Sequence, residues 1–196
     1  MIRFLAPLLA FGLLLAGCGD NSADTRPRAE RTPQTAAAQP PARTQPPGQV
    51  AFTLRDTDGN IRTADEWLGR KPVVINFWGT WCGPCRREIP DMVKIYREYS
   101  DRIEILGIAL NDTPDKVKRF SAQQGMTWQM LMGDQTVAVD FGIRGIPTTF
   151  FFDAKGNLFQ VEDYNGTIVN HYVGPRDYKT FKRAIESIIN SSPAGS

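Results

Sequence analysis

Cysteine and histidine are scarce in this chain of 196 residues, which contains three cysteines and a single histidine. A structural zinc site usually takes four cysteine or histidine ligands, and iron–sulfur clusters also need several cysteines. Covalent haem attachment requires a histidine directly after the second cysteine, but Cys82 and Cys85 are followed by Arg86. The sequence therefore predicts no metal and no cofactor. A copper site made by the two cysteines and His171 is the remaining metal hypothesis.

An excess of charge of one sign is absent as well. The chain has 23 Lys and Arg against 21 Asp and Glu, a net charge of +2. Arg3 and residues 19–48 together account for that small surplus, so the remainder is close to neutral. A neutral domain has no general electrostatic attraction for nucleic acid or for an acidic membrane surface, and we expect no nucleic-acid partner.

The sequence also lacks an apolar run of the ~20 residues that a bilayer span takes. The run from Phe4 to Leu15 is shorter and follows an arginine, a pattern typical of a secretory signal over residues 1–17. It leads into Leu-Ala-Gly-Cys, which resembles the lipoprotein box of bacteria. This resemblance implies cleavage before Cys18 and lipidation of its sulfur. The alternative is an ordinary export signal with an incidental cysteine.

Residues 19–48 contain six prolines but no aromatic residue and no Leu, Ile, Val or Met. Such a segment cannot bury apolar surface, so we expect a disordered tether. The expected organisation is a signal peptide at 1–17, a lipid-anchored linker at 18–48, a folded domain at 49–191 and a flexible tail at 192–196. A lipid anchor would place the folded domain in the bacterial cell envelope, on the periplasmic side of the inner or outer membrane.

Strand and helix signals alternate along the folded part, which predicts an α/β fold with a mixed sheet and helices on both faces. Strands are expected at 50–56, 72–78, 102–110, 126–132, 148–153, 158–164 and 168–174. Helices are expected at 63–69, 83–99, 113–124, 134–142 and 175–190.

The Cys82 and Cys85 pair falls just after a buried strand, where a helix begins. Unpaired N–H groups and the positive end of the helix dipole would stabilise a Cys82 thiolate, and Arg86 and Arg87 add positive charge nearby. One helical turn brings Cys85 within reach of a disulfide, and Pro84 is tolerated at the start of a helix. A purely structural disulfide is disfavoured, because closing so short a loop adds little stability. We therefore expect a redox couple in which Cys82 attacks and Cys85 resolves.

These features resemble thioredoxin-fold proteins, and more narrowly the exported TlpA/ResA-like thiol–disulfide oxidoreductases. The resemblance covers about residues 50–190. It rests on the motifs VVINFWGTWCGPCRREIP and GIRGIPTTFFFDAKG and on the helix and strand inserted at 113–132. It implies a thioredoxin-like mixed sheet. It also implies that Ile146 and Pro147 form a cis peptide facing the cysteine pair.

Three features depart from familiar patterns. Asn76 stands where thioredoxin has a buried acid, which agrees with the TlpA/ResA-like assignment. Gly83 supplies no side chain where some relatives place a glutamate, so no obvious proton-handling carboxylate is expected near the pair. Glu88, one helical turn further along, is the remaining candidate for that role but is expected to be solvated. The segment 158–170 is longer than the usual hairpin of the family and suggests an added strand or loop.

The remaining candidates divide between surface and core. Trp81 borders Cys82 and is expected to pack against a partner protein. Trp78 and Trp128 are expected in the core, and Pro90 is expected to kink the helix that carries the pair. His171 is expected on a surface strand.

The Gly-Pro dipeptide between the cysteines is shared with thioredoxin, a reductant at roughly −270 mV. We therefore expect a monomeric protein-disulfide reductase. The resemblance implies a membrane electron donor of the DsbD/CcdA type and exported substrates. Expected substrates are apocytochrome c cysteines, a copper-site assembly protein or wrongly paired disulfides. The alternatives are a copper-handling chaperone of thioredoxin fold and a thiol oxidase or peroxidase.

Overall fold

The computed structural model describes residues 50–191. The expected signal peptide, Cys18, the linker and the tail lie outside the described residues. None of the helices in the described range is long and apolar enough to span a bilayer.

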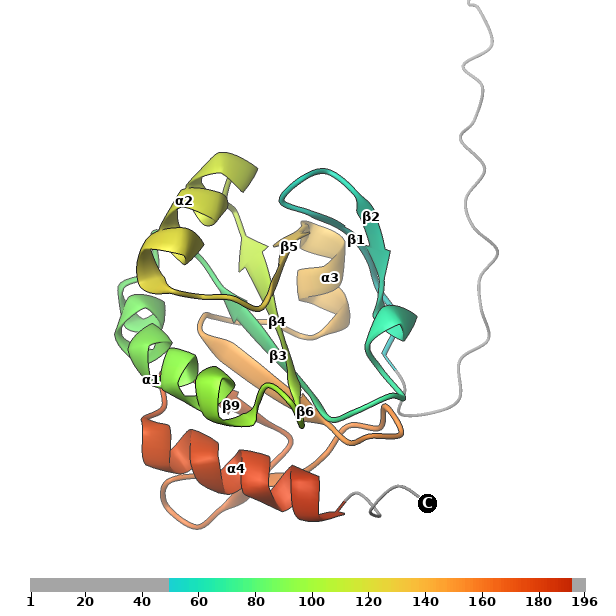
Figure 1. Cartoon of the computed structure of the whole chain (residues 1–196), viewed down its shortest axis with the longest axis vertical. Helices are drawn as coiled ribbons and strands as arrows, with labels where there is room; N and C mark the ends of the chain where they lie inside the picture. The colour runs from blue at the N-terminus through green and yellow to red at the C-terminus, as the bar shows by residue number, and fades with distance from the viewer. Residues whose placement is uncertain (1–49, 192–196) are drawn as a thin grey trace, which may run out of the picture. The chain divides into compact units, whose positions relative to one another are not determined.

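The described residues form a central seven-stranded mixed sheet with the strand order β2-β1-β5-β4-β3-β6-β9 (Figure 1). Strand β3 pairs in parallel with β4, β4 pairs in parallel with β5, and β6 and β9 close one side in antiparallel register. The strands are β1 (Thr53–Asp56), β2 (Ile61–Thr63), β3 (Val73–Trp78), β4 (Glu104–Leu110), β5 (Gln129–Gly133), β6 (Thr148–Phe152) and β9 (His171–Val173).

Helices cover both faces of this sheet, as the sequence predicts (Figure 1). They are α1 (Gly83–Tyr99), α2 (Pro114–Gln124), α3 (Gln135–Asp140) and α4 (Tyr178–Ser191), with a short 3₁₀ helix η1 at Ala64–Glu66. The side chains of β3 alternate between two cores because successive residues of a strand point to opposite faces. Val74 and Trp78 pack with α1, α2 and α4, whereas Ile75 and Phe77 pack with α3.

The inserted helix and strand are present as α2 and β5, and β5 joins the sheet between β1 and β4. The bounds of α1 and α2 agree with the sequence prediction. Helix α4 starts three residues later than expected, because the Asp177 carboxylate accepts a hydrogen bond from the Thr180 N–H at 2.9 Å and caps it.

The strand expected at 158–164 is shorter in the structure, where it is β7 (Val161–Glu162), and the strand expected at 168–174 is divided into β8 (Ile168–Val169) and β9. Strands β7 and β8 pair with each other as a separate two-stranded sheet, whereas β9 pairs with β6 in the main sheet. The added strand or loop suggested for 158–170 is therefore this small hairpin. The apolar pattern predicts an extended chain at 168–174 whether it forms one strand or is divided into two, and only pairing with distant segments decides this.

Candidate active site

The cysteine pair lies at the junction between the central strand and α1. Strand β3 is buried along its whole length and ends at Trp78, and α1 begins at Gly83 with Cys82 as its N-cap residue. The N–H of Cys85 donates to the Sγ of Cys82 at 3.1 Å. The two residues form a disulfide with a Cα–Cα distance of 5.3 Å, within the range that the first helical turn predicts.

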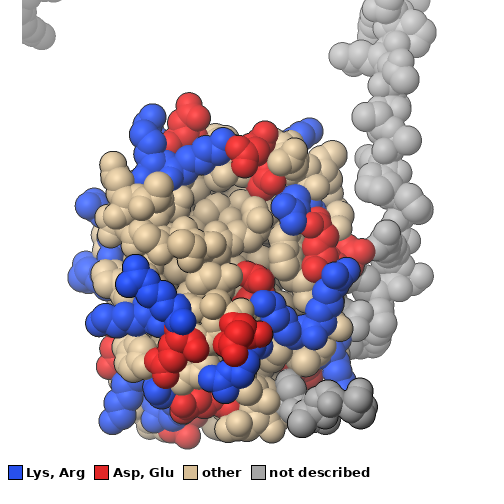
Figure 2. Space-filling view, viewed as in Figure 1, with Lys and Arg blue, Asp and Glu red and all other residues tan. Residues whose placement is uncertain are grey.

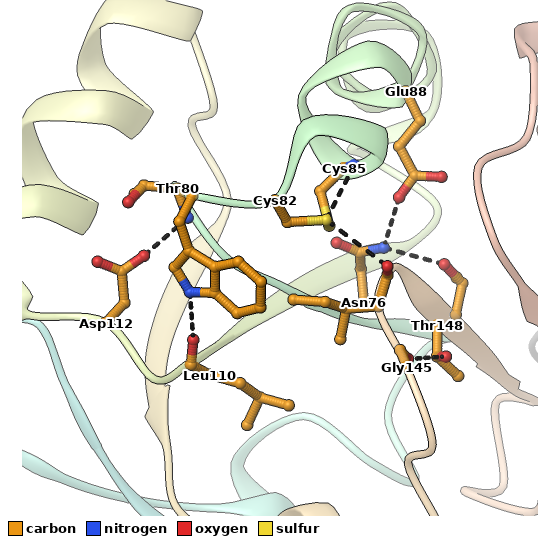
Figure 3. The surroundings of a disulfide bond; sticks show 12 residues. Asn76, Thr80, Cys82, Cys85, Glu88, Leu110, Asp112, Gly145 and Thr148 are labelled. Atoms are coloured by element: carbon orange, nitrogen blue, oxygen red, sulfur yellow. Dashed lines mark hydrogen bonds between the residues drawn. A yellow bond between two sulfur atoms is a disulfide. The ribbon is translucent and has the colours of Figure 1, made fainter.

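Both cysteines are buried, and they differ only slightly in access to solvent. Cys82 is 4% exposed and Cys85 is completely buried, so the order of exposure agrees with the expected roles. Gly83 is exposed and Pro84 half-buried in the loop of the pair. Ile146–Pro147 is a cis peptide, and the Ile146 carbonyl oxygen lies 3.6 Å from the Sγ of Cys82 (Figure 3). The turn before β6 thus faces the pair, as the resemblance implies.

Three tryptophans lie where the sequence places them. Trp78 and Trp128 are in the core, with 0% and 5% exposure. Trp81 is 57% exposed, although its indole N–H donates to the Leu110 carbonyl at 3.1 Å. The neighbouring Thr80 N–H donates to the Asp112 carboxylate at 2.7 Å (Figure 3). Trp81 therefore presents a large apolar surface, held in a defined orientation, beside Cys82.

Glu88 is the main correction to the sequence prediction. It is not solvated but 2% exposed, and Figure 3 shows its carboxylate pointing from α1 toward the Asn76 amide. The Asn76 Nδ2 donates to Glu88 at 3.0 Å and also donates to the Thr149 hydroxyl at 3.0 Å. The backbone N–H of Arg176 donates to the second Glu88 oxygen at 3.2 Å. A carboxylate therefore does lie near the pair.

Burial raises the pKa of Glu88 from 4.5 to about 7, against the opposing effects of the hydrogen bonds from Asn76 and Arg176 and of the Arg176 charge. The sequence did contain a signal for this burial. Cys85, Glu88, Ile89 and Met92 follow helical spacing, and all four are buried.

An ion pair that sequence reasoning missed holds Arg176 in place. The Arg176 guanidinium donates two hydrogen bonds to the Asp163 carboxylate, at 2.6 and 2.8 Å. Burial raises the pKa of Asp163, but the hydrogen bonds and charge of Arg176 outweigh this effect and leave the pKa below its usual value. Asp163 follows β7 and Arg176 precedes α4, so the pair links the small hairpin to the loop that contacts Glu88.

His171 lies on β9 as expected, but it is half-buried and its ring stacks on Phe150 with a centroid distance of 4.7 Å. Burial lowers the pKa of His171. Within residues 50–191 no three His, Cys, Asp or Glu side chains lie close enough to hold a metal ion. The copper hypothesis with Cys82, Cys85 and His171 therefore has no preassembled site in the described part of the chain.

A disulfide at the N-terminus of the helix that follows the central strand, with a cis proline facing it, defines this protein as thioredoxin-like. Residues 47–161 match the AhpC/TSA family, and the chain belongs to this family. The thiol-disulfide oxidoreductase ResA of Halalkalibacterium halodurans is 36% identical over 114 residues, which cover 57% of this chain and 64% of the relative. The chain thus spans slightly less than two thirds of that relative.

Two further similarities extend over more of the chain. The thiol:disulfide interchange protein HelX of Rhodobacter capsulatus is 34% identical over 136 residues, covering 67% of this chain and 69% of HelX. The crystal structure of a thioredoxin-family thiol:disulfide interchange protein from Chlorobium tepidum TLS aligns with a TM-score of 0.61 at 31% identity. That alignment covers 76% of this chain and 99% of the other. The thioredoxin-like fold predicted from the sequence is confirmed.

Proposed function

We propose that this protein is a thiol–disulfide oxidoreductase that reduces disulfides of exported proteins through Cys82 and Cys85. The observation that carries the proposal is the Cys82–Cys85 disulfide at the start of α1, where the Cys85 N–H points at the Cys82 sulfur. Similar proteins named thiol-disulfide oxidoreductase and thiol:disulfide interchange protein support it.

In the reduced protein, the Cys82 thiolate attacks one sulfur of a substrate disulfide. A mixed disulfide forms, and the first substrate sulfur leaves as a thiolate that takes up a proton. The Cys85 thiolate then attacks the Cys82 sulfur, which forms the Cys82–Cys85 disulfide and releases the second substrate thiol. Two electrons and two protons pass from the dithiol to the substrate.

The attacking role suits Cys82 for two reasons. Its sulfur accepts the Cys85 N–H at the positive end of α1, an interaction that favours the thiolate over the thiol. The exposed Arg86 and Arg87 add positive charge at the same helix end. The Ile146 carbonyl would accept a hydrogen bond from the neutral thiol and so opposes these effects, but it supplies only one contact, at 3.6 Å.

The buried Cys85 must lose its proton before it can resolve the mixed disulfide. Glu88 lies one helical turn further along α1 on the same buried side, with a pKa raised to about 7 by burial. A carboxyl group with such a pKa can take up and release protons near neutral pH. We assign Glu88 as the group that handles this proton, with Asn76 positioning its carboxylate through the 3.0 Å hydrogen bond.

The wider setting of the proposal comes from the sequence. Cys18 would carry a lipid anchor, the linker at 18–48 would tether the domain at 49–191 in the periplasm, and the protein would act as a monomer. A membrane donor of the DsbD/CcdA type would restore the dithiol. Cytochrome c maturation or metal-site assembly would supply the substrates.

The decisive experiment is insulin reduction with dithiothreitol as electron source. The Cys82→Ser variant should lose activity. After removal of dithiothreitol, reduced Cys85→Ser should form mixed disulfides with insulin that are visible on a non-reducing gel. Cys18→Ser is the matched control, because it removes a cysteine that the mechanism does not use. A Cys82→Ser protein that reduces insulin as fast as the parent would contradict the mechanism.

The direction of electron flow needs its own measurement. Equilibration of the pair with glutathione gives its potential, which we expect near the roughly −270 mV of thioredoxin. A potential near the about −120 mV of the strong periplasmic oxidant would instead make the protein a thiol oxidase.

A further inference from the structure

A hollow of about 330 Å³ opens to solvent next to the cysteine pair. Its wall includes Thr80, two residues before Cys82, and Arg86, directly after Cys85. Helix α2 supplies the rest of the lining, which consists of Lys116, Arg119, Phe120, Gln123 and Gln124. Positions 116, 119, 120 and 123 follow helical spacing, so one side of α2 faces this hollow.

The charges in this hollow all have the same sign. Its lining contains three cations, Arg86, Lys116 and Arg119, and no carboxylate. All three are exposed, and within residues 50–191 none of them forms an ion pair. The neighbouring Lys118 differs, because it pairs with Asp58 at 2.5 Å. Figure 2 shows Lys and Arg side chains on the side of the molecule that α1 and α2 occupy in Figure 1.

The hollow also has an apolar wall. The Arg86 guanidinium lies over the Phe120 ring, 5.7 Å from its centroid. This contact orients the arginine while its N–H groups remain unpaired with any carboxylate of the described residues. The side-chain amides of Gln123 and Gln124 can donate further hydrogen bonds. This combination of cations, amide donors and one ring suits a carboxylate on a short aliphatic stem.

We propose that this hollow binds an acidic stretch of the substrate protein, namely Asp or Glu side chains that lie a few residues from the cysteine under attack. The inference rests on the proposed function, because a mixed disulfide with Cys82 brings the chain around the substrate cysteine onto this surface. The exposed Trp81 would contact that chain, and the three cations would select for its charge. The protein would thus prefer disulfides flanked by acidic residues.

Binding tests the inference without any chemistry. The probe is a fluorescein-labelled peptide with one serine and three neighbouring glutamates. Its counterpart carries glutamines in place of the three glutamates. Anisotropy with the full-length disulfide form should show about tenfold tighter binding of the glutamate peptide at low salt, as expected for a few exposed ion pairs. The preference should shrink in 0.5 M NaCl, since salt screens exposed charges.

The test variant is Lys116→Gln/Arg119→Gln, which leaves Arg86 and the cysteine loop intact. It should bring the affinity ratio of the two peptides close to one. Lys155→Gln/Lys179→Gln is the matched control, because it removes the same charge from exposed positions that do not line the hollow. This control should keep the parent ratio.

Reduction rates then separate this inference from the proposed function. The same peptides are made as disulfides with cysteine in place of serine, and kcat/KM should favour the acidic peptide in the parent but not in the test variant. Equal affinities and equal rates for both peptides would overturn the inference while the oxidoreductase function stands. Tighter binding of the acidic peptide without reduction of either would show that the hollow binds acidic chains, but it would contradict the proposed function and with it the preference for acidic substrates.

Discussion

The side-chain amide of Asn76, in the middle of the central strand, donates a 3.0 Å hydrogen bond to the buried carboxylate of Glu88 on the helix that carries Cys82 and Cys85. This contact joins β3 to α1 through two residues that are 12 positions apart in the chain. It gives the site a titratable group near neutral pH, and two predictions depend on it.

The first prediction concerns stability and pH. Below pH 4.5 the Glu88 carboxyl is protonated in both the folded and the unfolded chain. Between pH 4.5 and 7 the unfolded chain loses this proton while the folded protein keeps it, so stability falls as pH rises. The rise of the pKa of Glu88 from 4.5 to about 7 corresponds to roughly 3 kcal/mol, which is fully lost above pH 7.

The Glu88→Gln variant lacks this ionisation. We expect the free energy of unfolding of the parent, minus that of Glu88→Gln, to fall by roughly 3 kcal/mol between pH 4.5 and 8. Urea denaturation of the parent and the variant, each in its disulfide form, measures this difference across that pH range. The contributions of the other ionisable groups largely cancel in the difference. Two parallel stability profiles would show that Glu88 does not titrate as described.

The second prediction concerns the resolving step. If Glu88 accepts the Cys85 proton, Glu88→Gln should slow release of substrate from the mixed disulfide by about a hundredfold, the usual size of general base catalysis. The initial attack by Cys82 should change far less. Rapid acid quenching followed by mass analysis resolves the two steps.

The pH dependence of the resolving step separates a chemical role from a structural one. The parent rate should rise through pH 7 as the carboxylate forms, and this rise should be absent from Glu88→Gln. An unchanged pH profile in the variant would assign the proton transfer to another group.

The third prediction concerns the Asp163–Arg176 pair, whose side chains are only 11% and 12% exposed. Arg176→Met should destabilise the protein by about 3 kcal/mol, since it leaves a largely buried carboxylate without its cation. Asp163→Asn should cost less, because the Arg176 Nη1 also donates to the carbonyls of Val173, Gly174 and Pro175.

Urea unfolding of the two single variants and the double variant measures the coupling between Asp163 and Arg176. The exposed Lys118–Asp58 pair provides the comparison, and Lys118→Met should change stability little. Additive effects of Arg176→Met and Asp163→Asn would mean that the pair does not tie the hairpin to the site.

The fourth prediction concerns Gly107, which pairs with Asn76 across β3 and β4. A Cβ added there would lie 2.8 Å from the Met130 sulfur and 3.0 and 3.1 Å from the indole nitrogens of Trp78 and Trp128. Gly107→Ala should therefore destabilise the protein by about 1–3 kcal/mol through overpacking.

Thermal unfolding followed by circular dichroism measures the effect of Gly107→Ala. Gly145→Ala is its control, since an added Cβ there meets nothing within 4 Å and the backbone is not in the left-handed region. Equal melting temperatures for both variants would show that the side chains of Met130, Trp78 and Trp128 can shift to make room for the added methyl group without loss of stability.

The amino-acid sequence by itself determined the local chemistry. The cysteine spacing, the strand before it and the N-terminal signals of α1 and α2 depend on neighbouring residues, and the predicted bounds of these two helices agree with the structure. The two core tryptophans were also expected. The cis peptide at Pro147 was implied only by the family resemblance, because the local sequence by itself indicates no more than a turn there. Motifs of this kind can be recognised in sequence because backbone geometry and capping act over a few residues.

Only the tertiary structure decided what surrounds that chemistry. Burial of Glu88 requires the strand that holds Asn76 and the loop at Arg176, which lie 12 and 88 residues away in the chain. The separation of β9 from the small hairpin, and the meeting of Arg86 with α2, likewise depend on distant segments. Desolvation and charge clustering depend on distances in space, and the folded chain alone sets those distances.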